Sequence, residues 1–259
     1  MTSRWIIIAL FFFGVICLFL YLTDPLPQDP AYHLFADQRT LLGISHFWNV
    51  VSNLPYLLVG IAACYELIRK KPRGYLPALH INYLVMFLGV MLVGPGSSWY
   101  HLHPSNQSLL WDRLPMAITF MAFASIIVGE YLHVRSGRLL LWPLVLVGIA
   151  SVVYWHVTEL YGRGDLRPYA IVQFLPMLLI PLLMLQRPGP YIKNTWAWWL
   201  MGCYLLAKVF EQADAAIYSI PGLISGHSIK HLVSAAGVLV FLVGLYRRKL
   251  QPDLQVKIQ

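Results

Sequence analysis

Long apolar stretches separated by short polar connections dominate this chain. A membrane-spanning helix needs about 20 predominantly apolar residues. The stretches that approach this length cover residues 5–22, 47–68, 80–99, 113–132, 139–158, 168–186, 195–213 and 227–246. The connections between them are too short to fold on their own. The pattern therefore predicts one all-α, polytopic membrane domain, with a seven-helix core over residues 47–246 and one additional N-terminal hydrophobic helix.

The N-terminal stretch has two interpretations. Arg4 precedes an apolar run, as in a signal peptide or in a first transmembrane helix. Residues 21–25 match a cleavage site poorly, which favours a retained helix or uncleaved signal anchor over residues 1–23. We expect residues 24–46 to form a non-cytoplasmic segment, and residues 247–259 to form a cytoplasmic tail.

Composition agrees with the apolar pattern. Hydrophobic residues make up 58% of the chain and charged residues only 12%, whereas soluble domains carry about 25% charged residues. The formal net charge of +8 could indicate nucleic-acid binding, but twelve basic residues fall in alternate connections and the tail, and only four in the opposite connections. Lysine and arginine are enriched in cytoplasmic loops of membrane proteins. The distribution of basic residues therefore predicts which connections lie in the cytoplasm, and we expect no nucleic-acid partner.

Three histidines lie at the ends of apolar stretches with a spacing suited to a metal ion. His101 ends one stretch, and His227 and His231 begin the last one. Residues four apart share one helix face, so the last two imidazoles point the same way. The predicted topology brings all three to the non-cytoplasmic leaflet. Three imidazoles with a fourth position left for water are typical of catalytic zinc. His103, in the following loop, is the alternative to His101.

Two further polar residues accompany the histidines. Ser97 lies one helical turn before His101, and Asp112 begins the next apolar stretch. Together with Asn49, Ser52 and Asn53, these motifs resemble those of the alkaline ceramidases, which belong to a superfamily of seven-helix membrane hydrolases that includes the progestin and adiponectin receptors. The resemblance covers residues 45–246, and Asp112 followed by Pro115 and Met116 favours the ceramidase branch.

The resemblance implies a function for each group. His101, His227 and His231 would hold zinc, Asp112 would act as general base and then acid, and Ser97 would donate a hydrogen bond to the oxyanion. The substrate would be a ceramide-like membrane lipid, hydrolysed at its N-acyl bond. Ser98 is an alternative to Ser97, although the four-residue spacing favours Ser97.

The chain departs from the family pattern at His46, at Arg113 and in its additional N-terminal helix. His46 stands where the family has an acidic residue of its calcium site, so activity is expected to depend little on calcium. Asp24, Asp29 and Asp37 still offer oxygen donors, which leaves Ca²⁺ open as a second cofactor. Arg113 replaces a glutamate that often follows the aspartate, which changes the charge at the mouth of the expected site.

The sequence is also compatible with other functions. The fold could serve a zinc-containing receptor or regulator without ceramide turnover, and substrate turnover would distinguish the two. A bis-histidine haem protein would absorb visible light, and it would leave Ser97 and Asp112 without a role. The metal could also be purely structural.

Overall fold

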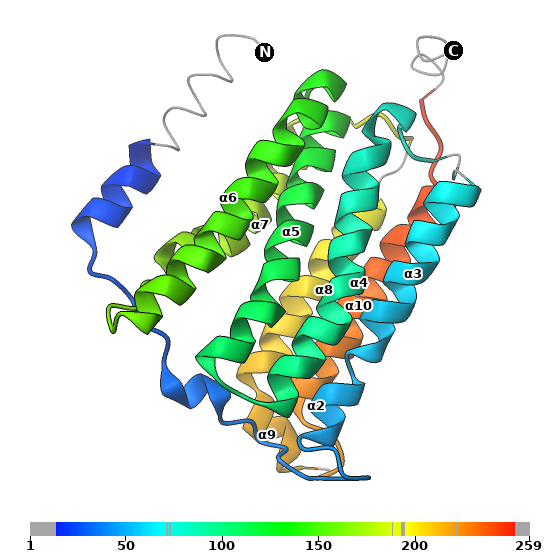
Figure 1. The fold of residues 1–259 in the computed structure, drawn as a ribbon. Helices are drawn as coiled ribbons and strands as arrows, with labels where there is room; N and C mark the ends of the chain where they lie inside the picture. The colour runs from blue at the N-terminus through cyan, green and yellow to red at the C-terminus, as the bar shows by residue number, and fades with distance from the viewer. Residues whose placement is uncertain are drawn as a thin grey trace.

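A computed structural model describes residues 14–251, apart from 71, 73, 188, 193, 194 and 221. Its described residues form helices and no strands (Figure 1). The α-helices are α2 (Phe47–Val51), α3 (Leu54–Arg69), α4 (His80–Leu102), α5 (Asn106–Tyr131), α6 (Val134–Leu160), α7 (Arg167–Gln186), α8 (Thr195–Gln212), α9 (Asp214–Tyr218) and α10 (Gly226–Arg247). Two 3₁₀ turns, η1 (Pro30–His33) and η2 (Pro77–Leu79), complete the elements. The predicted all-α class is confirmed.

Six described segments are long and apolar enough to cross a membrane. They are Phe47–Arg69, Pro77–Leu102, Asn106–Tyr131, Val134–Leu160, Arg167–Gln186 and Gly226–Arg247. The predicted span at 195–213 is also helical, but α8 is less apolar because it carries Lys208, Glu211 and three tryptophans. Residues 14–22 are helical, and the rest of the predicted N-terminal helix lies outside the described residues. The chain is a polytopic helical membrane protein.

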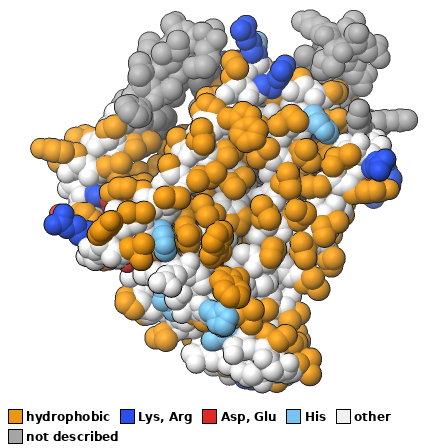
Figure 2. Space-filling view, in the orientation of Figure 1, with side chains coloured by type: hydrophobic (Ala, Val, Ile, Leu, Met, Phe, Trp, Pro, Cys, Tyr) orange, Lys and Arg blue, Asp and Glu red, His pale blue; other side chains and the backbone are white. Residues whose placement is uncertain are grey.

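The long helices pack as a bundle with extensive contacts between α3 and α4, α4 and α5, α5 and α6, and α8 and α10. Figure 2 shows hydrophobic side chains over most of the visible face, with lysine and arginine near its margins. We call the end where α4 ends and α10 begins the site end. The other end, where α5 ends and α6 begins, is the basic end (Figure 1).

Two of the helix boundaries that differ from the apolar pattern affect the site end. The stretch 47–68 is interrupted at Ser52 and Asn53, because Pro55 occupies the first turn of α3 and has no N–H to continue the ladder from α2. Helix α5 begins at Asn106, not at 113, since the Ser105 hydroxyl accepts a hydrogen bond from the Ser108 amide and caps the helix. Asp112 therefore lies within the helix, about two turns from its cap.

Residues 24–46 cross the site end between the N-terminal helix and α2 (Figure 1), and we call them the strap. His33 bonds to the Tyr100 hydroxyl through Nδ1 and to the Asn106 side chain through Nε2, both at 2.9 Å. Asp214 accepts hydrogen bonds from the amides of Ala36 (3.0 Å) and His227 (2.7 Å). The strap is thus tied to α4, α5, α9 and the start of α10.

Candidate metal centre and its cavity

The structure brings His101, His227 and His231 together at the site end. One nitrogen of each ring lies within 4.8 Å of the others, and this is the only such group of histidine, cysteine or acidic residues in the described part of the chain. All three are buried, with exposed fractions of 1%, 5% and 4%. Ser225 caps α10 by accepting from the Ser228 amide, so the helix starts one residue before His227. Capping thereby places both α10 histidines within the first two turns.

The spacing of the rings suits a metal ion. The Nε2 atoms of His101 and His227 lie 3.3 Å apart. Zinc bonded to imidazole nitrogens at about 2.0–2.1 Å in tetrahedral geometry separates two of them by about 3.3 Å. Nδ1 of His101 is buried and has no hydrogen-bond partner in the described region. Three imidazole nitrogens, each of which can bind a metal ion in its neutral form, therefore fit zinc.

Helix α2 supports the third histidine. The Ser52 hydroxyl lies 2.8 Å from Nδ1 of His231 and 3.2 Å from the Asn49 carbonyl oxygen. If Ser52 donates to that carbonyl, it accepts from Nδ1–H, and Nε2 of His231 remains available to a metal ion. The Asn49 side-chain oxygen accepts from the Ser228 hydroxyl at 2.7 Å, which links α2 to α10. The break after α2 thus orients a ligand.

The strap covers the centre through Phe35. Its ring lies edge-on to the rings of His101 and His227, with a centroid distance of 4.6 Å to each. Phe35 is itself buried. The apolar ring separates the histidines from the side of the molecule on which the strap lies, and it limits access to them from that side.

The alternative ligand and the calcium donors lie apart from the centre. His103 is exposed and contacts Trp99, so it does not join the histidine group. Asp29 caps η1, and Asp24 is exposed on the strap. Arg39 is hydrogen-bonded to both carboxylate oxygens of Asp37, at 2.8 and 2.7 Å. Burial acts to raise the pKa of Asp37, but these bonds and the charge of Arg39 prevail and lower it.

Ser97 and Asp112 meet at the interface of α4 and α5. The Ser97 side chain is buried and lies within hydrogen-bonding reach of the Asp112 carboxylate. The close approach depends on Gly96, where a Cβ atom would lie 2.2 Å from the Trp111 carbonyl oxygen. Ser98 instead donates to the Val50 carbonyl at 3.2 Å, and so faces α2. Of the two serines, the structure brings Ser97 next to the aspartate.

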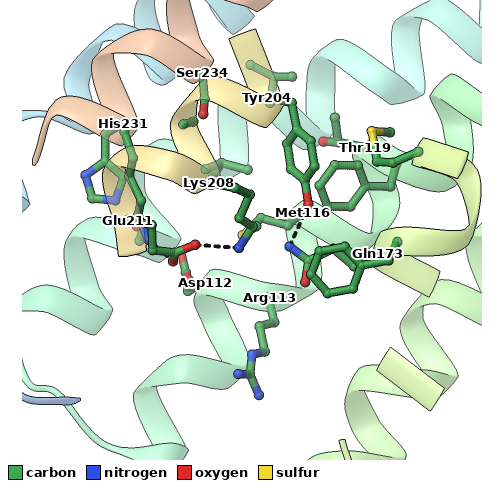
Figure 3. A pocket seen from close by; sticks show the side chains of 18 of the residues that line it. Asp112, Arg113, Met116, Thr119, Gln173, Tyr204, Lys208, Glu211, His231 and Ser234 are labelled. Carbon is green, nitrogen blue, oxygen red and sulfur yellow. Dashed lines mark hydrogen bonds and ion pairs between the residues drawn. The ribbon is translucent and has the colours of Figure 1, made fainter. Parts of the chain in front are cut away.

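A cavity of about 380 Å³ connects these groups. Ser97, Asp112 and His231 line it together with apolar side chains of α4, α5, α7, α8 and α10. Figure 3 shows His231, Glu211 and Asp112 along one side and Tyr204 and Gln173 on the other. Its size falls within the range of about 300–1,000 Å³ that is usual for small-molecule sites. A mostly apolar cavity with a few polar groups can hold a lipid chain beside the metal centre.

Three charged side chains in this cavity were not anticipated from the sequence. Glu211 pairs with Lys208 at 2.5 Å and with Lys230 at 2.6 Å, which joins α8 to α10 (Figure 3 draws the Lys208 pair). Lys230 directly precedes His231. Ionisable residues inside apolar helices are costly and usually functional, and that signal could have identified Lys208 and Glu211 within the stretch 195–213.

Comparison with known proteins identifies the family of this chain. The family model described as Ceramidase matches residues 40–253, which is most of the chain. The protein belongs to the ceramidase family. A search of curated proteins finds no match. The family membership supports a ceramidase-like hydrolase that acts on an amide bond of a lipid and is integrated in the membrane.

Proposed function

We propose that the protein is a zinc-dependent intramembrane lipid amidase, which hydrolyses the N-acyl bond of a ceramide-like sphingolipid to a fatty acid and a sphingoid base. The observation that carries this proposal is the buried group of three histidine nitrogens beside an apolar cavity that also contains Asp112 and Ser97. The family match supports the same chemistry.

His101, His227 and His231 would hold the zinc ion. When bound, zinc polarises a substrate carbonyl and makes a water molecule acidic near neutral pH. The Asp112 carboxylate lies outside the group of metal-facing atoms. It is therefore suited to take a proton from water at a carboxylate oxygen and to return it to the nitrogen of the leaving amine.

Ser97 has a single hydroxyl proton, so at any moment it can serve either Asp112 or the oxyanion. Its side chain lies within hydrogen-bonding reach of Asp112. We propose that it holds this carboxylate before the reaction and donates to the oxygen of the scissile carbonyl as negative charge develops there. Phe35 and the apolar wall keep bulk water away from these groups.

We further propose that the site end faces the non-cytoplasmic side and that the C-terminus is cytoplasmic. Among the described residues, the basic end carries Arg69, Lys70, Arg135, Arg138, Arg187, Arg247, Arg248 and Lys249. Fewer lysines and arginines lie in the strap and the connections of the site end. This asymmetry is the one expected from the enrichment of basic residues in cytoplasmic loops.

The test measures zinc content and amide hydrolysis on the purified full-length protein. We expect about one zinc ion per chain and release of labelled fatty acid from N-dodecanoyl sphingosine. His227→Ala should lose both zinc and activity, because two imidazoles hold the ion poorly. His103→Ala is the matched control, since this exposed histidine lies outside the group.

Two results would contradict the proposal. Stoichiometric zinc without turnover of any N-acyl lipid would indicate a receptor or regulator. Full zinc content in His227→Ala, with loss in His103→Ala, would show that the ligand set is wrong.

A further inference from the structure

Arg113 is a buried cation that has no acidic partner among the described residues. Its exposed fraction is 6%, and none of the ion pairs in the described part of the chain includes it. Nη2 donates to the side-chain oxygen of Gln28 at 2.6 Å. Nη1 is buried and has no hydrogen-bond partner among the described residues. A buried guanidinium with an unused donor is costly unless something else compensates it.

Aromatic rings hold this guanidinium in place. Its central carbon lies 4.1 Å from the centroid of the Trp155 ring and 4.9 Å from that of Tyr169. Stacking of this kind stabilises a cation, but it supplies no negative charge and no acceptor for Nη1. The rings fix the orientation of the group and leave its charge uncompensated.

The other charges of the cavity are already engaged. Arg113, Lys208 and Lys230 line it together with only two carboxylates, Asp112 and Glu211. Both lysines share Glu211, while Asp112 lies within reach of Ser97. Figure 3 shows the Arg113 side chain extending away from Lys208 and Glu211. The cavity thus has an excess of positive charge even before a metal ion is bound, and Arg113 provides it at a separate position.

We propose that Arg113 binds an anionic group at the polar end of the substrate, a phosphate monoester or a carboxylate, and that the enzyme therefore favours anionic N-acyl lipids over neutral ones. This inference rests on the proposed function, since it assigns the headgroup of the same substrate. The planar guanidinium matches both anions with two parallel N–H donors. A neutral headgroup leaves Nη1 unpaired and the charge uncompensated, which is how a polar site rejects the wrong ligand.

The test compares three probes with the same acyl chain: N-dodecanoyl sphingosine, its phosphate monoester on the primary hydroxyl, and the acid in which a carboxylate replaces the primary alcohol. In detergent micelles, wild-type kcat/KM should be higher for one or both anionic probes than for the neutral one. Arg113→Gln should lower kcat/KM for the preferred anionic probe about 10- to 100-fold, as expected for loss of a hydrogen bond to a charged group. The loss for the neutral probe should be clearly smaller than the loss for the preferred anionic probe.

Arg163→Gln is the matched control, because it removes one positive charge from an exposed residue at the same end of the bundle. Arg113→Lys keeps the charge and loses the planar fork, so it should lose part of the anionic preference, and it serves if Arg113→Gln does not fold. The probe that wild-type protein prefers distinguishes phosphate from carboxylate.

Equal wild-type kcat/KM for the three probes would overturn the inference. An equal loss for neutral and anionic probes in Arg113→Gln would also overturn it, because it would indicate a purely structural arginine. If no probe is hydrolysed, the proposed function fails on its own. Displacement of a fluorescent N-dodecanoyl lipid then tests Arg113 independently. At least one of the two anionic probes should displace it more weakly from Arg113→Gln than from wild-type protein, and unchanged displacement by both would overturn the inference.

Discussion

Arg113 and Arg248 are both buried arginines stacked on aromatic rings, yet their polar surroundings are opposite. Arg248, at the basic end, lies 3.9 Å from the Tyr191 ring centroid and pairs with Glu130 through Nη2 at 2.7 Å and Nη1 at 3.3 Å. Its Nη2 also bonds to the Tyr83 hydroxyl at 2.6 Å. Arg113, at the site end, hydrogen-bonds within the described residues only to Gln28, and its Nη1 has no partner there. The same residue type thus occurs once with its donors used and once with a donor left over.

The difference extends to the two ends of the bundle. At the basic end, a hydrogen-bonded network joins Arg248 and Glu130 with Tyr83 and Tyr191, away from the cavity. This network ties Arg248, which follows α10, to α5 and α4. At the site end, polar groups line the cavity, and two of them, Asn53 and Arg113, each have a buried side-chain atom without a hydrogen-bond partner in the described region. A satisfied buried network stabilises a fold, whereas unsatisfied groups beside a cavity indicate a place for a ligand.

The largest effect is expected for Asp112→Asn, which changes the site end without removing a metal ligand. The amide keeps the size of the side chain but cannot accept the proton from water. Hydrolysis should fall about 10²- to 10⁴-fold, while zinc content and the unfolding midpoint stay near wild-type values. Ser97→Ala should lose less, also with zinc retained. Parent-level hydrolysis in both variants would refute the mechanism, and loss of zinc in both would make these residues supports of a structural metal.

Glu130→Gln at the basic end is expected to lower stability and to leave hydrolysis nearly unchanged, the reverse of Asp112→Asn. Both partners of the Arg248–Glu130 pair have fully buried side chains. Breaking such a pair leaves an uncompensated buried charge and costs about 3–5 kcal/mol of stability. The midpoint of detergent-induced or thermal unfolding should fall, while kcat of the protein that remains folded should change little. Glu66→Gln disrupts the more exposed pair with Lys70 and should lower the unfolding midpoint much less.

If Glu130→Gln instead abolished hydrolysis with stability unchanged, a satisfied network would no longer distinguish a structural region from a functional one.

The smallest effect concerns Asp37, a satisfied carboxylate within the strap at the site end. Its folded pKa is lowered because Arg39 outweighs the effect of burial, so the pair stabilises the fold above the unfolded pKa of about 4 and loses that contribution as pH falls through the folded pKa. Wild-type protein should be slightly more stable than Asp37→Asn near neutral pH. The gap in melting temperature should shrink as the pH falls below the unfolded pKa of about 4.

Asp24→Asn, at an exposed strap position, is the control for this measurement. A gap that is constant with pH would show that the Asp37–Arg39 pair does not account for the stability difference. A gap that depends on added calcium would indicate that Asp37 serves as a cation ligand after all.

Much of the fold follows from local pattern. Apolar runs of nearly 20 residues predict helices because only helices satisfy the backbone inside a bilayer. The helical content, six of the spans and the four-residue spacing of His227 and His231 needed no tertiary information. The alternation of the spans also places the end of α4 and the start of α10 at one end of the bundle. The convergence of three histidines could therefore be predicted, and the structure brings them together.

Other features depend on which helix faces meet, and a linear pattern does not contain that information. Phe35 covers the histidines only because the strap crosses the site end. Lys208, Glu211 and Lys230 compensate one another only because α8 packs against α10. Arg113 could be recognised in the sequence as a change of charge. Its unused Nη1, in contrast, is a property of the packed bundle. Among the described residues, α5 directs the Arg113 side chain toward Gln28 and Trp155 and toward no acidic residue. Sequence spacing determines which residues share a helix face, whereas the rotation and packing of each helix decide which buried charges find a partner and which remain for a ligand.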